Sequence, residues 1–226
     1  MFSSCKCKIH ECTNLAISSF DENGNILDTQ DGYCLKHDSD SKTKSQQIIE
    51  YIKTHDKIVG LDASYVSLEN IDISNKKFFC CNFQHCSFSN ITGNNILERM
   101  CIHNFSTFTD CSFLNTNIIY SSFAGSNLVH AIFTGSDLIH NNFNGITIYQ
   151  SSFDDCDLYN SRFIKAIFFT VSMNNCNLKK TIFYDSVRDN VSFKLSNTRE
   201  AIIDREGLVH DLTTSNLSAQ LNEAEK

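Results

Sequence analysis

The chain has 226 residues, among them 18 Phe and 11 Cys, and it contains neither Pro nor Trp. Its formal charge of -7, from 26 acidic and 19 basic side chains, argues against a general nucleic-acid or anionic-membrane binder, because phosphate contacts need a surplus of Lys and Arg. No run of about 18 apolar residues is present, which excludes a membrane span, and the first residues lack the apolar core of a signal peptide. We therefore expect a cytoplasmic protein whose cysteines are thiols or metal ligands rather than disulfides.

Residues 1–39 are expected to form a separate unit, because potential metal ligands are concentrated there. The segment contains a C-x4-C pair and, after a longer excursion, a C-x2-H pair. Two such pairs can wrap one tetrahedral metal ion, and the pattern KCKIHEC with DGYCLKH is similar to small treble-clef-like or ribbon-like zinc modules. The alternative is a mobile leader with unliganded thiols. We predict a structural Zn²⁺ site formed by Cys7, Cys12, Cys34 and His37, with Cys5 or His10 as substitute ligands.

The next two elements are a hairpin and a helix. The excursion SSFDENGNILDTQ has Asn-Gly between apolar residues, which predicts a β-hairpin inside the first unit. Residues 40–59 are expected to be a capping helix and linker. Ile48, Ile49 and Ile52 follow a polar start at helical spacing, which predicts a helix over residues 41–54 that covers the beginning of the segment that follows.

From residue 60 onward, apolar residues recur every five positions. Of the 27 positions in this frame from Ala63 to Phe193, 23 are apolar and 13 are Phe. The four positions that do not fit are Gly93, Glu98, His103 and Arg188. A period of five matches neither a helix nor a strand, and internal repetition at a fixed period predicts a solenoid.

A second column supports the same frame. Two positions before the central residue there is usually a small or β-branched side chain, and six of the seven cysteines beyond residue 34 occupy this slot. Because Cys packs well as a small hydrophobe, we interpret these thiols as structural, and only Cys80 lies outside the slot. The six cysteines are Cys81, Cys86, Cys101, Cys111, Cys156 and Cys176.

Segments such as SNLVH, SDLIH, CDLYN and CNLKK resemble the pentapeptide-repeat family, whose motif is written A(D/N)LXX. The resemblance covers about residues 61–196. It implies an all-β solenoid over residues 60–196, a right-handed quadrilateral β-helix with four pentapeptides in each coil. The absence of Pro agrees with this fold, because every coil pairs its backbone with the coils above and below.

Two segments leave the pattern. Residues 91–104 break the central column but keep its register, which indicates either a distorted coil or a loop projecting from the rod. Residues 197–226 are expected to be a C-terminal cap and a polar tail, in which residues 201–203 form a helix-like turn ended by Gly207.

In each five-residue repeat, the residue that directly follows the central apolar residue faces solvent. Such residues that are twenty positions apart lie above one another on the same face of the rod. Two outward columns are apolar, and they lie on opposite faces. We predict that one of them binds a protein partner or a second copy of the chain, the alternative being ordinary isolated surface hydrophobes. The first column is Val129, Tyr149 and Phe169, and the second is Ile119, Ile139 and Tyr159.

No catalytic constellation is evident. His130 and His140 lie outside any nucleophile motif, and the adjacent Asp154 and Asp155 point differently. We therefore predict that the protein is not an enzyme but a protein-interaction or scaffold module, with a homodimer left open. One alternative, implied by the resemblance, is a DNA-mimicking gyrase protector, although 11 acidic and 9 basic side chains between residues 60 and 198 give too little negative charge. The other is a thiol or metal sensor that uses the N-terminal cysteines.

Overall fold

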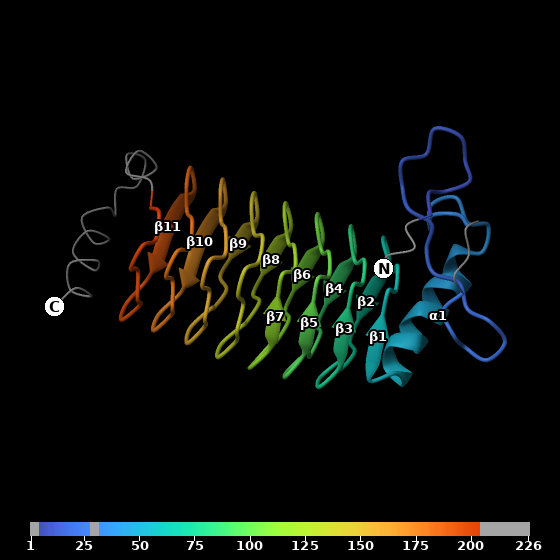
Figure 1. The fold of residues 1–226 in the computed structure, drawn as a ribbon, viewed down its shortest axis with the longest axis horizontal. Coiled ribbons are helices and arrows are strands. Elements are labelled where there is room, and N and C mark those ends of the chain that lie inside the picture. Colours follow the sequence, from blue (N-terminus) through green and yellow to red (C-terminus); the bar gives the residue numbers. More distant parts are fainter. Residues whose placement is uncertain (1–4, 28–31, 204–226) are drawn as a thin grey trace.

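The computed structural model describes residues 5–27 and 32–203, and these residues form a rod with a helix and a small N-terminal unit at one end (Figure 1). The helix α1 (Ser41–Thr54) has the predicted bounds. Short strands follow at regular intervals along the chain. They are β1 (Lys57–Val59), β2 (Ser67–Glu69), β3 (Lys77–Phe79), β4 (Ser87–Ser89), β5 (Leu97–Arg99), β6 (Thr107–Thr109), β7 (Asn117–Ile119), β8 (Asn127–Val129), β9 (Thr147–Tyr149), β10 (Ile167–Ser172) and β11 (Val187–Ser192).

The strands form two parallel sheets whose register is always twenty residues. One sheet has the order β1-β3-β5-β7 and the other β11-β10-β9-β8-β6-β4-β2. Lys57 pairs with Lys77 in the first sheet, and Ser67 pairs with Ser87 in the second. The other walls are joined by isolated parallel bridges with the same spacing, such as Asp62 with Asn82. The predicted all-β solenoid is confirmed as a parallel β-solenoid of about seven turns.

The core consists of the predicted central column, stacked from coil to coil. Phe123, Phe143, Phe163 and Phe183 lie face to face, with ring centroids 5.2, 4.8 and 5.2 Å apart. Each of these rings is buried, and burying one side chain of this size contributes about 1.5–3 kcal/mol. The repeated burial of Phe therefore drives the coils to stack.

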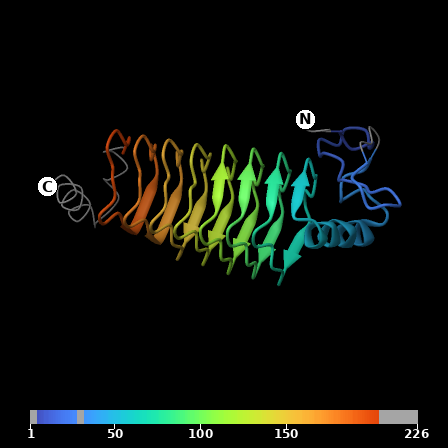
Figure 2. The same ribbon diagram turned by 60° about the horizontal axis from the view of Figure 1, so that its bottom comes forward.

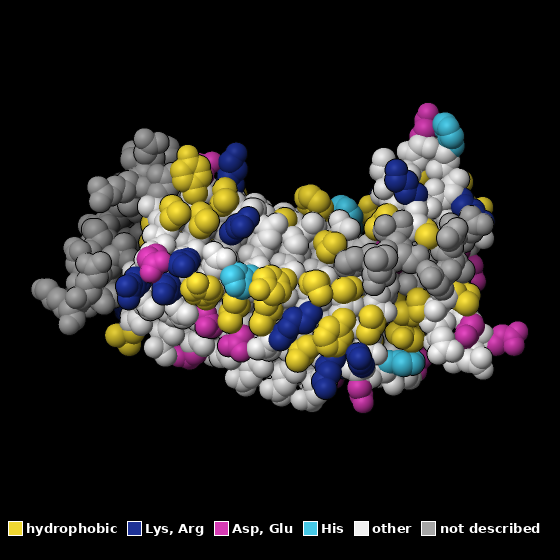
Figure 3. Space-filling model, in the orientation of Figure 1, with side chains coloured by type: hydrophobic (Ala, Val, Ile, Leu, Met, Phe, Trp, Pro, Cys, Tyr) yellow, Lys and Arg dark blue, Asp and Glu magenta, His cyan; other side chains and the backbone are white. Residues whose placement is uncertain are grey.

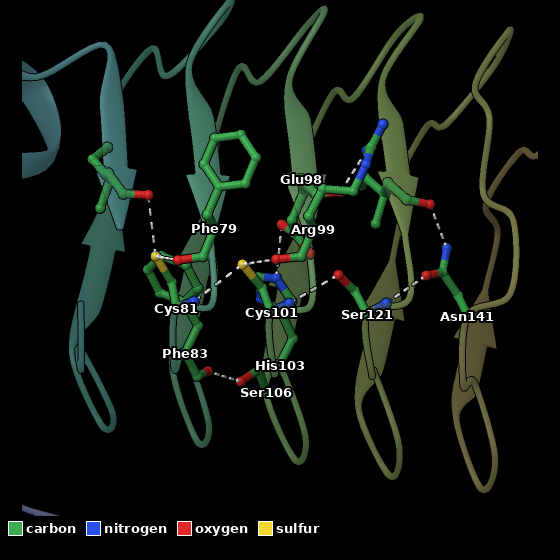
Figure 4. A network of polar contacts seen from close by, with 12 residues as sticks. Phe79, Cys81, Phe83, Glu98, Arg99, Cys101, His103, Ser106, Ser121 and Asn141 are labelled. Carbon is green, nitrogen blue, oxygen red and sulfur yellow. Dashed lines mark hydrogen bonds and ion pairs between the residues drawn. The ribbon is translucent and has the colours of Figure 1, made fainter. Parts of the chain in front are cut away.

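The small slot joins neighbouring coils through hydrogen bonds as well as filling space. Ser106 donates from Oγ to the carbonyl of Phe83 at 2.6 Å, and the same oxygen accepts the backbone N–H of Cys86 at 3.0 Å. Figure 4 shows the same pattern in another corner, where the N–H of Cys101 donates to Ser121 Oγ at 3.1 Å and the N–H of Ser121 donates to Asn141 at 2.8 Å. A buried N–H without a partner costs about 1–3 kcal/mol, so the slot selects small side chains that can also form hydrogen bonds.

Residues 91–104 form a regular coil, so the expectation of a projecting or distorted segment is wrong. Thr92 bridges Asp72 and Ser112 on either side, and Glu98 lies at the centre of β5. The misfits Glu98 and His103 are buried in the core and face each other, with Oε2 and Nε2 3.0 Å apart (Figure 4). The imidazole takes the place of a phenyl ring in the stack, 5.1 Å from Phe83 and 4.6 Å from Phe123.

The Glu98–His103 pair borders a cavity of about 30 Å³ in the core. Within the described part of the chain, Oε1 of Glu98 and Nδ1 of His103 have no hydrogen-bond partner. A cavity of this size holds a water molecule when polar atoms line it. The periodicity alone suggests a core filled throughout by apolar side chains, and the buried Glu98–His103 pair and its cavity are an exception to this.

The two ends of the rod differ from each other. Ile48 and Ile52 of α1 are buried against the first coil. Lys76 donates to the carbonyl of Lys53 in the last turn of the helix and to that of His55, the residue that follows it. The predicted helix-like turn over residues 201–203 is wrong, because Ile202 bridges Ile182 and continues the solenoid. Gly207 and the polar tail lie outside the described residues. Among the described residues, no helix has the length and apolar character needed to cross a bilayer.

Candidate metal centre and outward columns

The predicted ligands Cys7, Cys12, Cys34 and His37 converge at one place in the N-terminal unit. Their ligand atoms all lie within 4.8 Å of one another. Sγ of Cys12 and Sγ of Cys34 are 3.9 Å apart, and Nδ1 of His37 is 3.4 Å from Sγ of both Cys7 and Cys34. Zinc with its usual bond lengths of ~2.3 Å to sulfur and ~2.0 Å to nitrogen gives tetrahedral edges of ~3.8 Å and ~3.5 Å. These three contacts match the edges of such a tetrahedron and all pairs lie within 4.8 Å, so the Cys₃His set could hold one metal ion.

Two tight turns present these ligands. The N–H of Cys12 donates to the carbonyl of Ile9, and the N–H of His37 donates to the carbonyl of Cys34. A parallel bridge between Cys7 and Gly32 then brings the turns together. Gly32 is required there, because a Cβ atom at this position would lie 2.9 Å from the Cβ of Ala16. Cys5 and His10 lie outside the four-residue cluster.

The thiols of the cluster differ in acidity. Burial raises the pKa of Cys7, but hydrogen bonds from the backbone N–H groups of Cys34 and Ile9 and from His37 outweigh it, and the pKa falls to about 6. The N–H of Asn14 lowers the pKa of Cys12, but desolvation and the two neighbouring thiols leave it raised. One thiol is thus easily deprotonated, as metal coordination requires.

A hydrogen-bond path connects the cluster to the rod. Asn14 donates from Nδ2 to Sγ of Cys34 at 3.7 Å and accepts from the hydroxyl of Tyr65 in the first coil at 3.0 Å. Lys36 lies over the ring of Tyr65, with Nζ 4.7 Å from its centroid. Sequence reasoning missed Asn14 and Tyr65, because a contact between residues 51 positions apart leaves no spacing signal.

The hairpin connects the N-terminal unit to α1. Phe20 and Ile26 form an antiparallel bridge around a turn at residues 21–25, which confirms the predicted hairpin. The ring of Phe20 packs on Tyr51 of α1, with centroids 5.0 Å apart. Figure 2 shows α1 and the N-terminal unit together at one end of the rod.

The outward columns stack in the predicted register. Val129 pairs with Tyr149 and Tyr149 pairs with Phe169 across β8, β9 and β10. Tyr149 is 43% exposed and Phe169 is 37% exposed, while Val129 is half-buried. In the second column, Ile119, Ile139 and Tyr159 are all half-buried. Figure 3 shows hydrophobic side chains in a band along the rod, with Lys and Arg side chains among them.

Comparisons with known proteins agree with the repeat pattern. A family profile described as pentapeptide repeats matches residues 104–135, 120–155 and 131–168. No curated protein matches the chain.

Several solved structures resemble the chain at low identity. A trypsin-treated variant of QnrB1, a plasmid-mediated fluoroquinolone resistance protein, is 17% identical over 74% of this chain and 88% of its own, with a TM-score of 0.49. HetL from the cyanobacterium Nostoc sp. strain PCC 7120, involved in heterocyst differentiation regulation, is 11% identical over 68% of this chain and 91% of its own, with a TM-score of 0.29. Rfr23 from the cyanobacterium Cyanothece 51142 is 9% identical over 70% of this chain and 99% of its own, with a TM-score of 0.32. The pentapeptide-repeat profile thus matches residues 104–168 of this chain, and the twenty-residue register extends the same repeat along the rest of the rod.

Proposed function

We propose that this protein is a non-enzymatic, cytoplasmic interaction scaffold whose rod presents apolar columns to a protein partner. The observation that carries the proposal is the column of Val129, Tyr149 and Phe169, which lies on three successive coils of one sheet. Its backbone is held by parallel pairing on both sides, so the side chains keep a fixed spacing. A rigid array of exposed aromatic side chains is a typical anchor for a protein partner.

The test is site-specific crosslinking followed by substitution. A photo-crosslinking amino acid at position 149 should trap a defined protein from cell extract, and Tyr149→Ser with Phe169→Ser should abolish its capture without changing the thermal midpoint. Tyr184→Ser is the matched control, because Tyr184 is 54% exposed but lies on another wall of the rod. Capture that survives the double substitution, or that Tyr184→Ser also abolishes, contradicts the proposal.

We also propose that the N-terminal cluster binds one structural Zn²⁺ ion through Cys7, Cys12, Cys34 and His37. All four ligands come from the protein, so the metal would stabilise the fold and leave no open position for chemistry. The path from Cys34 through Asn14 to Tyr65 supports a second role. By fixing the two turns, the metal would hold the N-terminal unit against the first coil and protect that end of the rod.

Metal analysis tests this site. Purified wild-type protein should carry one zinc per chain, and Cys34→Ser should lose it together with the heat resistance of the N-terminal unit. Cys80→Ser is the control, because Cys80 is a half-exposed cysteine away from the cluster. Zinc content that is equal in Cys34→Ser and wild type, or zinc absent from both, contradicts the proposal.

The two alternative functions predict different results. A gyrase protector would relieve quinolone inhibition of gyrase in a supercoiling assay, and a sensor would release zinc reversibly on mild oxidation of the N-terminal cysteines. The scaffold proposal expects neither effect, because the repeats lack a dense negative surface and a structural site retains its metal.

A further inference from the structure

Two opposite walls of the rod carry complementary side chains. One wall contains β1, β3, β5 and β7 and continues through residues 138, 158 and 178; we call it the basic wall. The other contains β2, β4, β6, β8, β9, β10 and β11; we call it the acidic wall. A coil has twenty residues and the two walls are ten residues apart along it, so they lie on opposite sides of the rod.

The charges of the two walls have opposite sign. The basic wall presents Lys57, Lys77, Arg99 and Lys179, and the acidic wall presents Glu69, Asp110 and Asp189. Two of these groups also have partners within the chain, since Lys179 lies 3.7 Å from Glu200 and Asp110 lies 2.9 Å from His130. On the acidic wall no Lys or Arg of the described residues reaches solvent, because Arg188 is buried. Asp137 and Asp157 also lie on the basic wall and reduce its positive charge, and each accepts a hydrogen bond from an Asn amide of a neighbouring coil, at 2.7 and 3.0 Å.

The complementarity holds in six of the seven coils, the exception being the second coil, where Lys77 and Phe79 on the basic wall correspond to Ser87 and Ser89 on the acidic wall. Members of a matching pair are ten to twelve residues apart, so they differ in height by about half of the ~4.8 Å coil spacing. Opposite charges occupy the coils toward the two ends, and apolar pairs occupy the three coils between them. The charged pairs are Lys57 with Glu69, Arg99 with Asp110 and Lys179 with Asp189, and the apolar pairs are Ile119 with Val129, Ile139 with Tyr149 and Tyr159 with Phe169.

We propose that copies of this chain associate side by side, parallel and in register, with the basic wall of one copy against the acidic wall of the next. This inference deepens the proposed scaffold function by naming the partner of both apolar columns as a second copy. The chain runs in opposite directions on the two walls, so a sideways shift of about two residues, ~7 Å, brings the columns into contact. The apolar pairs would supply burial, and Lys179 with Asp189, which occupy the same strand position as the apolar residues, would fix the register. In this arrangement Lys57 would lie about two residues along the strand from Glu69 and would reach it only through its long side chain.

Pairing of two like walls is disfavoured by the same charges. Two basic walls in antiparallel arrangement would bring Lys57 against Lys179, and two acidic walls would bring Glu69 against Asp189. Contact between unlike walls is heterologous and leaves one wall free at each end of the assembly. The association should therefore extend into rows of rods, and it should weaken as salt screens the charges.

Sedimentation velocity of charge-reversed variants tests the inference. The wild-type chain should show a weight-average mass that rises with concentration and falls at high salt. Lys57→Glu with Lys179→Glu reverses one wall, and Glu69→Lys with Asp189→Lys reverses the other. Each double variant alone should associate at least tenfold more weakly than the wild type, and an equimolar mixture of the two should recover association, because the reversed walls are again complementary.

Controls separate this inference from the scaffold proposal. Circular dichroism should show that all variants keep the solenoid, Tyr149→Ser with Phe169→Ser should abolish association, and Tyr184→Ser should not affect it. A wild-type chain that remains monomeric at every concentration, or a mixture that does not recover association, overturns the inference. Neither result affects the scaffold proposal, which fails only if crosslinking at position 149 traps no protein that depends on the column.

Discussion

Replacement of the buried Glu98–His103 pair by the residue types found elsewhere in the central column should leave the rod intact and can make it more stable. The pair occupies two consecutive positions of that column, and its side chains are almost fully buried. His103→Phe alone leaves the Glu98 carboxyl group buried without a partner, and should cost about 3–5 kcal/mol of unfolding free energy. Glu98→Leu alone leaves the imidazole without its 3.0 Å partner and should cost about 1–3 kcal/mol.

The double substitution Glu98→Leu with His103→Phe restores the repeat. The new ring lies between Phe83 and Phe123, which already stack on the imidazole. Replacing a buried polar or ionic pair by apolar side chains is often neutral or stabilising by about 1–4 kcal/mol. Urea denaturation of the four proteins forms a double-mutant cycle. The two single costs together with a neutral double variant give an expected coupling energy of about 4–8 kcal/mol. A double variant less stable than both single variants would refute this reasoning.

Three further predictions concern hydrogen bonds and thiols. The carboxylate of Asp110 and then the amide of Gln150 raise the pKa of His130. Protonated His130 therefore stabilises the folded protein at pH values below the ordinary His pKa, and this stabilisation is lost as the pH rises through the raised pKa. NMR titration should show a lower midpoint for His130 in Asp110→Asn, and an unchanged midpoint would contradict the assignment. Ser106→Ala should cost about 1–3 kcal/mol and speed amide exchange in the preceding coil; unaltered exchange would count against the role of the slot. Burial raises the pKa of Cys176 to about 12, so iodoacetamide should alkylate Cys80 in the native protein and leave Cys176 unmodified, as peptide mass mapping can check.

The predictions that succeeded depend on local repetition. A five-residue period of Phe and Leu can bury its large side chains only if the chain turns at every repeat, which is why the solenoid and its register follow from the sequence. The helix over residues 41–54 and the hairpin around residues 21–25 were predictable for a similar reason, because helical spacing and an Asn-Gly turn are local signals.

The convergence of Cys7, Cys12, Cys34 and His37 was also predictable, because the spacing of the pairs limits which atoms can meet. What spacing did not reveal is the contact from the cluster through Asn14 to Tyr65. The wrong expectation for residues 91–104 has a related cause. Glu98 and His103 were treated as separate misfits, whereas two consecutive in-frame residues of opposite chemistry are a signal for a buried pair.

The sequence by itself determined the coil, its twenty-residue register and the inward columns, because each follows from a side chain that must be buried at a fixed interval. Only the tertiary structure decided how the polar exceptions are accommodated and what the outer surface presents. Closing the coil places Glu98 against His103 in the core and puts the charges of residues half a coil apart on opposite walls. A periodic pattern predicts which residues are buried in the core of the solenoid. The distances between residues of different coils depend on how the coils stack.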